Sequence, residues 1–197
     1  VPVDVPGRKG TVVRFDGDEI PSKEPRTSEE ALAGLRPAFK RDGIVTAGNA
    51  SKISDGASAL VVMSREKARE LGCRPLVRIG AQGSSGLDMK YVLVAPIKSI
   101  PKVLAKDGLG VKDVDLHEIN EAFSTSSVAI NRELGLDPEK VNVNGGSVAL
   151  GHPIGASGAR VLTTLIHAMK ARGAGIGEAS LCLGGGESVT LVVYNEG

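Results

Sequence analysis

Hydrophobic positions follow different patterns in the first quarter of the chain and in the remainder. Up to about residue 53 the apolar residues have no regular period, and five prolines interrupt the segment. Only residues 28–39 have helical spacing, with Ser28 in the position of an N-cap and with Leu32 and Leu35 on one face. Such a segment cannot build a core of its own. We therefore expect it to cover another part of the protein, in part as a binding loop.

From residue 55 onward, short apolar or alternating runs of strand type alternate with stretches of helical period. The expected strands are 57–63, 76–79, 114–119, 179–183 and 188–194, with a further short run at 141–144, and the expected helices are 65–71, 95–105, 121–134 and 159–172. This order predicts an α/β fold in which a five-stranded sheet carries helices on both faces. The last two strands form a hairpin, which makes the sheet mixed. The expected domains are residues 1–53 and 54–197.

Composition excludes several functional classes. The chain has 197 residues, a net charge of +1, and hydrophobic and charged fractions of 41% and 24%. These values argue against disorder, nucleic-acid binding and membrane-surface binding, and they favour small molecules and other subunits as partners. No apolar run approaches the roughly 20 residues of a membrane helix, and no leader-like segment is seen. The first residue is Val1, and we expect the sequence to be a fragment or a processed chain.

Cysteine usage points to a reducing compartment, so we expect the protein to be cytoplasmic. Cys73 and Cys182 are the two cysteines, and no CxxC spacing occurs. This count argues against a disulfide framework and against a zinc site, and no metal is expected.

The loop Gly151–Gly158 carries the first candidate for chemistry. Glycines bracket His152, and a helix with a buried face follows at once. The positive end of that helix favours a neutral imidazole that donates a hydrogen bond, or one that stabilises a nearby anion. The alternative interpretation is a glycine-rich loop with a hydrogen-bonded structural histidine.

Two further candidates lie at the ends of expected strands. Cys182 is separated by one residue, Leu183, from three glycines, of which Gly184 is the first, and such a turn can direct backbone N–H groups at a ligand. A lone cysteine in a strand is more often inert core. Asn120 lies where a strand meets a helix, at the edge where open α/β sheets hold ligands. Its alternative interpretation is a helix N-cap.

Two other functions fit the loop less well. Gly151, Gly155 and Gly158 have a GxxxGxxG spacing, but no first βαβ unit and no acidic residue after the next strand accompany it, which argues against a dinucleotide site. A serine hydrolase built on Ser157 lacks the GxSxG elbow. His117 and His167 are assigned no catalytic role.

Three motifs occur in one order: Asn120-Glu121-Ala122-Phe123, Gly151-His152-Pro153-Ile154-Gly155-Ala156-Ser157-Gly158 and Cys182-Leu183-Gly184-Gly185-Gly186. With them the chain resembles the thiolase family, and within it the acetyl-CoA acetyltransferase (acetoacetyl-CoA thiolase) branch. The resemblance extends through nearly the whole chain, including residues 6–10, 35–39 and 46–51. It implies a thiolase-like layered fold in which the irregular first segment is the tail of a lid over coenzyme A.

The resemblance implies a two-step Claisen condensation of two acetyl-CoA molecules, or its reverse, with a place in fatty acid metabolism. Cys182 would be the acid/base that takes a proton from the methyl group of the second acetyl-CoA. His152 and a water held by Asn120 would form an oxyanion hole, and the N–H of Gly184 would join a second one. His152 would also activate the acylated nucleophile. Coenzyme A thioesters are then substrates, and no cofactor is expected.

The resemblance also implies which residues contact coenzyme A and that the protein forms an oligomer. At two places the sequence departs from the family pattern. The expected contacts with coenzyme A are Leu35, Ala38, Phe39, Ala47, Ser51 and Ala122. The family is dimeric or tetrameric, so a homo-oligomer is expected. Residues 91–96 and Lys52 depart from the family pattern near the acyl pocket and near Ser51, which leaves acyl-chain preference open.

The largest departure is the nucleophile. The family's acylated cysteine belongs to an N-terminal half that has no counterpart in these 197 residues, and Cys73 is not a substitute. We therefore expect the chain alone to be inactive and to need that half on the same or another polypeptide. A 3-ketoacyl-CoA thiolase for longer chains and a non-catalytic fragment that binds coenzyme A or assembles are the two alternatives.

Overall fold

A four-stranded mixed sheet forms the centre of the fold. The computed structural model describes residues 1–21 and 27–196. The strand order is β3 (Val77–Gly86), β6 (Glu187–Asn195), β5 (Ile176–Leu183), β4 (Leu116–Ile119). Strand β4 runs parallel to β5, whereas β6 is antiparallel to both of its neighbours. The predicted α/β class, the mixed sheet and the final hairpin are confirmed, but the sheet has four strands and not five.

The difference in strand number comes from the run 57–63, and the further short run at 141–144 forms no strand either. The apolar run 57–63 is extended and pairs with no strand of the described residues, and Val61 is 86% exposed. The run at 141–144 makes one isolated parallel bridge, between Val141 and His117, and then turns. Apolar content predicted a strand in the first case, but a strand needs a neighbour to satisfy its backbone groups.

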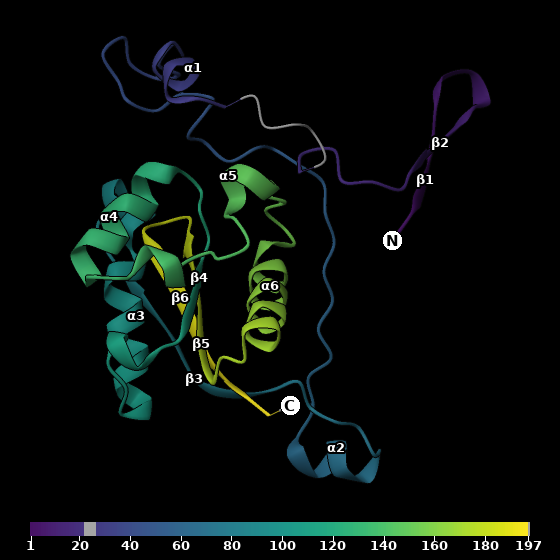
Figure 1. Ribbon diagram of the computed structural model, residues 1–197, viewed down its shortest axis with the longest axis vertical. Coiled ribbons are helices and arrows are strands. Elements are labelled where there is room, and N and C mark those ends of the chain that lie inside the picture. Colours follow the sequence, from purple (N-terminus) through teal and green to yellow (C-terminus); the bar gives the residue numbers. More distant parts are fainter. Residues whose placement is uncertain (22–26, 197) are drawn as a thin grey trace.

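Helices cover both faces of the sheet, as predicted. Figure 1 shows α3 (Pro96–Leu104) and α4 (Ser124–Leu134) on one side and α6 (Ser157–Arg172) on the other. On the α3 side, Ile100 packs in a cluster that includes Val192. On the α6 side, Leu165 packs in a cluster that includes Val193. Adjacent residues of β6 thus point to opposite faces, and two cores form on one sheet.

Helix boundaries follow capping residues where these are present. Ser28 accepts a hydrogen bond from the N–H of Ala31 at the start of α1 (Glu29–Ala33), and Ser64 does the same for Lys67 in α2 (Arg65–Glu70). The first of these helices is shorter than the predicted 28–39. Helix α3 begins at Pro96 and contains Pro101. The remaining helical elements are α5 (Ser147–Leu150) and short 3-10 turns at Arg8–Gly10, Met89–Val94, Ala105–Asp107, Val111–Asp113 and Pro138–Lys140.

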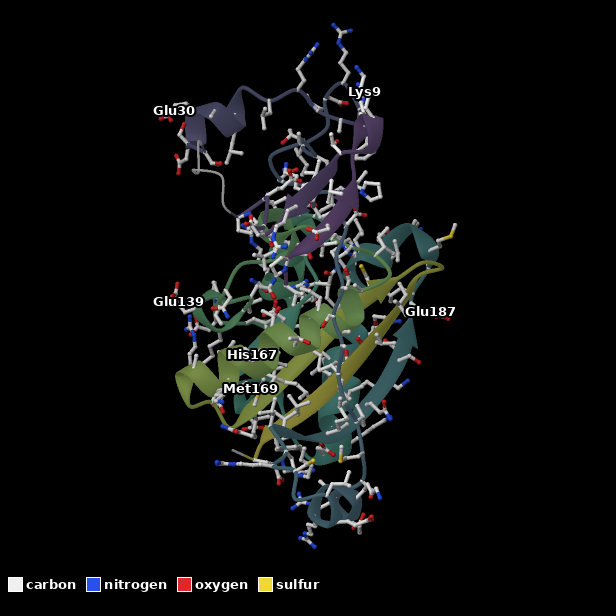
Figure 2. All side chains as sticks on the ribbon, turned by 90° about the vertical axis from the view of Figure 1, so that its right-hand side faces the viewer. Lys9, Glu30, Glu139, His167, Met169 and Glu187 are labelled. Carbon is white, nitrogen blue, oxygen red and sulfur yellow. The ribbon has the colours of Figure 1, made fainter. Side chains whose placement is uncertain are left out.

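The hairpin and the helix of the first segment, within residues 1–21 and 27–34, extend away from the sheet (Figure 1). Strands β1 (Val3–Pro6) and β2 (Val12–Phe15) form an antiparallel hairpin that sequence analysis did not predict. Lys9 in this hairpin region and Glu30 in α1 lie at the end of the molecule opposite α2 (Figure 2). One of the five prolines, Pro25, lies outside the described residues.

An extended segment connects this region to the sheet. It runs beside α6 towards α2 (Figure 1), and the hydroxyl groups of Ser58 and Thr163 lie 2.9 Å apart. Helix α6 therefore has the sheet on one side and this segment on another. Among the residues that the structure describes, no helix combines the length and apolar character required to cross a membrane.

Candidate active site

The site is built around Asn120, which follows the last residue of β4. Its N–H continues the sheet by donating to the carbonyl of Ser180, 2.8 Å away, and the residue is 5% exposed. The preceding residue, Ile119, is held on its other edge by Asn142, whose Oδ1 accepts from its N–H at 2.8 Å and whose Nδ2 donates to its carbonyl at 2.9 Å. Asn120 is therefore fixed by the strand and is not an N-cap, because α4 begins at Ser124.

Asn120 and His152 are brought together from separate parts of the sequence. Asn120 Nδ2 lies 3.3 Å from His152 Nε2, and His152 Nδ1 lies 2.6 Å from the hydroxyl of Ser157. The Ser157 hydroxyl donates to the carbonyl of Pro153 at 3.0 Å. Both ring nitrogens of His152 thus have partners. Burial and, second, the charge of Arg160 lower the pKa of His152 below its ordinary 6.5, which favours the neutral imidazole.

A buried ion pair lies beside this contact. Arg160 of α6 reaches Glu118 Oε1 of β4 at 3.3 Å, and the two side chains are 17% and 3% exposed. Burial raises the pKa of Glu118 from 4.5 to about 7, against the opposing effect of Arg160 and with a smaller contribution from Glu178. Burial also lowers the pKa of Arg160, and Glu118 partly offsets this. His117, the histidine of β4, is buried and pairs with Glu178 at 3.0 Å.

The loop that carries His152 is held by the segment that follows residue 50. The N–H of His152 donates to the carbonyl of Lys52 at 2.9 Å. Gly151 has a φ of +93°, and a Cβ added there would lie 2.5 Å from Ser54 Oγ. A glycine is required at this position both by its backbone conformation and by the close approach of the neighbouring segment.

The residues expected to contact coenzyme A gather around the start of α4. The N–H of Ser51 donates to the carbonyl of Ala122 at 3.0 Å, and Ala50 and Phe123 form an antiparallel bridge. The rings of Phe39 and Phe123 meet edge to face at 6.4 Å.

The other members of this expected set lie in the same segment. Gly48 lies close to the side chain of Leu35, Ala38 donates its N–H to the carbonyl of Val45 at 2.8 Å, and the Lys52 ammonium donates to the carbonyl of Ala47 at 2.6 Å. Phe39 and Ser51 thus contact the Asn120–Phe123 motif, whereas Leu35, Ala38 and Ala47 are held by other residues of their own segment.

Cys182 lies on β5 just before the glycine turn to β6. By strand alternation it shares a face with Ser180, whereas Leu181 packs in the cluster of α6. Within residues 1–21 and 27–196, the hydrogen bonds around Asn120 and His152 do not include its thiol. Burial raises the pKa of this thiol above its ordinary 9.0, partly offset by its own backbone N–H.

The turn after Cys182 is shaped by its glycines. Gly184 begins it, and Gly185 and Gly186 have φ values of +88° and +92°. The carbonyl of Gly186 accepts from the N–H of Leu87 at 2.8 Å, which fastens the turn to the segment before Met89–Val94. Contacts with residues 87–89 therefore fix the backbone of this turn. A side chain at Gly186 would collide with Leu87 and Met89.

Comparison with models of known protein families shows the family to which the chain belongs. Residues 1–66 match the model described as "Thiolase, N-terminal domain", and residues 73–195 match "Thiolase, C-terminal domain". The chain belongs to the thiolase family. This confirms the resemblance deduced from the three motifs. The expected domain division at residues 53 and 54 stays a prediction.

Thiolases of known name and structure resemble the chain over nearly all of its length. The acetyl-CoA acetyltransferase of Allochromatium vinosum is 51% identical over 193 residues, which are 98% of this chain and 48% of the relative. The structure of the Bacillus anthracis acetyl-CoA acetyltransferase matches with a TM-score of 0.93 at 49% identity, over 99% of this chain and 49% of that one. Human mitochondrial 3-ketoacyl-CoA thiolase matches with a TM-score of 0.87 at 38% identity, over 100% and 48%. The chain thus spans about half the length of the thiolases it matches.

Sequence analysis did not identify several residues that lie around Asn120 and His152. Arg160 and Ser147 contact the amide oxygen of Asn120, and Glu118 contacts Arg160. Ser157, considered only as a nucleophile, is the partner of His152 Nδ1. The one signal for Arg160 was its position next to Val161, on the helix face that becomes buried. Its partners come from β4 and α5, so only the tertiary structure shows its role.

Proposed function

We propose that the chain supplies the acid/base and oxyanion-binding part of a thiolase that condenses two acetyl-CoA molecules to acetoacetyl-CoA and CoA, or cleaves acetoacetyl-CoA. One observation carries the proposal: a buried asparagine at the carboxyl end of β4 meets the imidazole of His152, with Asn120 Nδ2 3.3 Å from His152 Nε2. An amide and an imidazole placed together in this way, partly withdrawn from water, suit the negative charge that develops on a thioester oxygen, once His152 Nε2 carries a proton that it can donate.

In this proposal the reaction has two steps. A cysteine thiolate attacks the thioester of one acetyl-CoA, which forms an acetyl-cysteine and releases CoA. Cys182 then takes a proton from the methyl group of the second acetyl-CoA, and the resulting enolate attacks the acetyl-cysteine and frees the thiolate. His152 and a water held by Asn120 stabilise the enolate, and the N–H of Gly184 belongs to the second oxyanion hole.

The raised pKa of Cys182 bears on its proposed role. A buried thiol that holds its proton at neutral pH is ready to return it to the enolate in the cleavage direction. In condensation the same thiol must first lose that proton, and the resulting thiolate is then the stronger base for being buried. Substrate binding and the acetylated partner cysteine would complete the environment in which this transfer occurs.

The nucleophilic cysteine is proposed to come from a polypeptide segment other than these 197 residues. The chain spans about half the length of its relatives. Cys73 is exposed just after α2, which contributes no residue to the hydrogen bonds around His152. The proposed partners are therefore that segment, coenzyme A thioesters along residues 35–51 and Ala122, and further copies of the protein in a cytoplasmic homo-oligomer.

A direct assay compares the chain alone with the chain joined to the missing part of a relative. The part of the Bacillus anthracis enzyme without a counterpart here is supplied as a fusion or as a separate polypeptide. We expect no cleavage of acetoacetyl-CoA by the chain alone and measurable cleavage by the combination. Activity of the chain alone would contradict the proposed origin of the nucleophile. An inactive combination that still binds CoA would favour the non-catalytic alternative.

Substrate length is tested with the same combination. Residues 91–96 occupy a 3-10 turn and the start of α3, and Tyr91 is 55% exposed with the Lys90 ammonium 4.9 Å from its ring centroid. Acetoacetyl-CoA is expected to have a higher kcat/KM than longer 3-ketoacyl-CoA substrates. The opposite order would favour the longer-chain thiolase.

A further inference from the structure

We propose that Arg160 is a positioning residue that orients the amide of Asn120 and, through that amide, fixes which nitrogen of His152 carries the hydrogen. The meaning of this role for catalysis rests on the proposed function, but the role itself concerns only groups of this chain. Arg160 lies on the first turn of α6, and its side chain is 17% exposed. It contacts the oxygens of three side chains: Glu118 in β4, Asn120 directly after β4, and Ser147 in α5.

The first step concerns the amide of Asn120. Arg160 Nη2 lies 3.2 Å from Asn120 Oδ1, and the hydroxyl of Ser147 donates to the same oxygen at 2.7 Å. A guanidinium has only donors, so the group that faces it must be the amide oxygen. The same Nη2 also donates to Ser147 Oγ at 3.1 Å, which leaves the Ser147 hydrogen for Asn120. The amide NH2 of Asn120 must then face His152.

The second step concerns the imidazole. An amide NH2 only donates, so His152 Nε2 must accept, and in the neutral ring the hydrogen is then on Nδ1. Nδ1 lies 2.6 Å from Ser157 Oγ, whose own hydrogen is used on the Pro153 carbonyl. Ser157 therefore accepts from Nδ1, in agreement with the first step. Every hydrogen in this series points the same way, from Arg160 through Asn120 and His152 to Pro153.

The other tautomer would place two donors against each other. With the hydrogen on Nε2, the ring and the Asn120 NH2 would each direct a hydrogen at the other, and Ser157 would have to turn away from Pro153. Rotation of the Asn120 amide would relieve this clash only by directing its NH2 at Arg160. Glu118 completes the arrangement, because its carboxylate accepts from Nη1 and holds the guanidinium in place.

The consequence for the proposed reaction is a lone pair on Nε2 in the resting protein. Nε2 can then accept the proton of a nucleophilic thiol and afterwards donate that hydrogen to a thioester oxygen. Arg160 thus prepares His152 as a base without contacting the substrate. Its positive charge also helps to keep the resting ring neutral, so the lone pair on Nε2 is present before a substrate binds.

The test is the long-range proton–nitrogen NMR spectrum of the ring of His152 in the 197-residue chain labelled with 15N-histidine. The chain has three histidines, and a His152→Gln variant assigns the resonances. We expect a neutral ring with Nδ1 protonated and Nε2 unprotonated. In Arg160→Met the ratio of the two tautomers should fall by roughly tenfold, as expected for the loss of one buried hydrogen-bond constraint, and the pKa of His152 should rise.

Two further variants make the test specific. Arg172 lies on the same helix, is exposed and donates to the carbonyl of Val143 at 3.4 Å, so Arg172→Met is the matched control and should keep the wild-type spectrum. Arg160→Lys keeps the positive charge but replaces the guanidinium and its two Nη donors by a single ammonium group. It should lower the tautomer ratio while the pKa of His152 stays low, a split that a purely structural role would not produce.

A wild-type ring with its hydrogen on Nε2 would overturn the proposal, whether or not any variant folds. Folded Arg160→Met and Arg160→Lys proteins that both keep the wild-type tautomer ratio would overturn it as well. No substrate enters these spectra. A ring with Nδ1 protonated, in a combination that does not cleave acetoacetyl-CoA, would therefore refute the proposed function and leave this inference standing.

Discussion

The N–H of His152 donates to the carbonyl of Lys52 across 2.9 Å, so the loop of the candidate site is fastened to a segment one hundred residues earlier in the chain. In the same segment, the N–H of Ser51 donates to the carbonyl of Ala122, two residues after Asn120. The position of His152 relative to Asn120 therefore depends on contacts with residues 50–54 as well as on the sheet. Changes that push this segment away should disturb the site.

Gly151→Ala tests this dependence. An added Cβ would lie 2.5 Å from Ser54 Oγ and 3.1 Å from Ile20 Cδ1, at a φ of +93° that favours glycine. We expect the free energy of unfolding to fall by roughly 1–3 kcal/mol, which thermal or urea denaturation would measure. Gly155→Ala is the matched control in the same loop, because a Cβ there meets no atom within 4 Å. Equal losses in both variants would contradict the account.

Asn142→Ala tests the hydrogen bonds that hold Ile119, the last residue of β4, directly before Asn120. The Asn142 side chain makes two hydrogen bonds with the backbone of Ile119, and its φ is +47°. Alanine removes both bonds, each worth about 1 kcal/mol, in a conformation that asparagine tolerates better. Denaturation should show a clear loss of stability. Asn144→Ala, at a neighbouring exposed position, should change stability by no more than about 0.5 kcal/mol. An Asn142→Ala protein as stable as this control would argue against the edge contact.

The raised pKa of Cys182 predicts slow alkylation at neutral pH. In a Cys73→Ser background, which removes the exposed thiol, the rate of reaction with iodoacetamide should rise with pH and reach half its maximum above 9.0. Mass spectrometry of the modified peptide gives the rate. A midpoint well below 9.0 would show that burial does not control this thiol.

The raised pKa of Glu118 predicts that the free energy of unfolding depends on pH. Its pKa is about 7 in the folded protein and 4.5 ordinarily, so between these values the unfolded chain loses a proton that the folded protein retains. Unfolding then releases a proton, and the free energy of unfolding falls as pH rises from about 4.5 to about 7. The total is on the order of 3 kcal/mol and stays constant above this range.

The comparison with Glu118→Gln isolates this effect. Glutamine keeps an oxygen for Arg160 and does not titrate, whereas Glu178 and the other groups nearby are unchanged. Denaturant unfolding between pH 4.5 and 8 should give a wild-type stability that falls relative to the variant over this range. Parallel curves would mean that folding does not raise the pKa of Glu118.

Local signals predicted much of the fold. Ser28 and Ser64 cap helices because N-capping depends on neighbouring residues, and the final hairpin follows from two apolar runs around three glycines. The start of α4 was placed three residues too early, because Glu121 is a good helix former. In the structure its carboxylate instead accepts from the N–H of Val148 and the hydroxyl of Ser124.

Tertiary features were not predictable from such signals. The run 57–63 has the composition of a strand, but strand formation depends on a pairing partner, and composition does not reveal one. Asn120 and His152 were identified as candidates from motifs, yet the orientation of their side chains depends on Arg160, Ser147 and Ser157. A hydrogen-bond network with members from β4, α5 and α6 leaves no periodic trace in a single sequence.

The central claim is that this chain carries the acid/base part of a thiolase site and that the acylated nucleophile is supplied by another segment. The most direct measurement is peptide mass spectrometry of the chain combined with the missing part of a relative, quenched in acid after exposure to acetoacetyl-CoA. The account predicts an acetyl group on a cysteine of the added part, with Cys73 and Cys182 unmodified. An acetyl group on Cys182, formed at the rate of turnover, would contradict it.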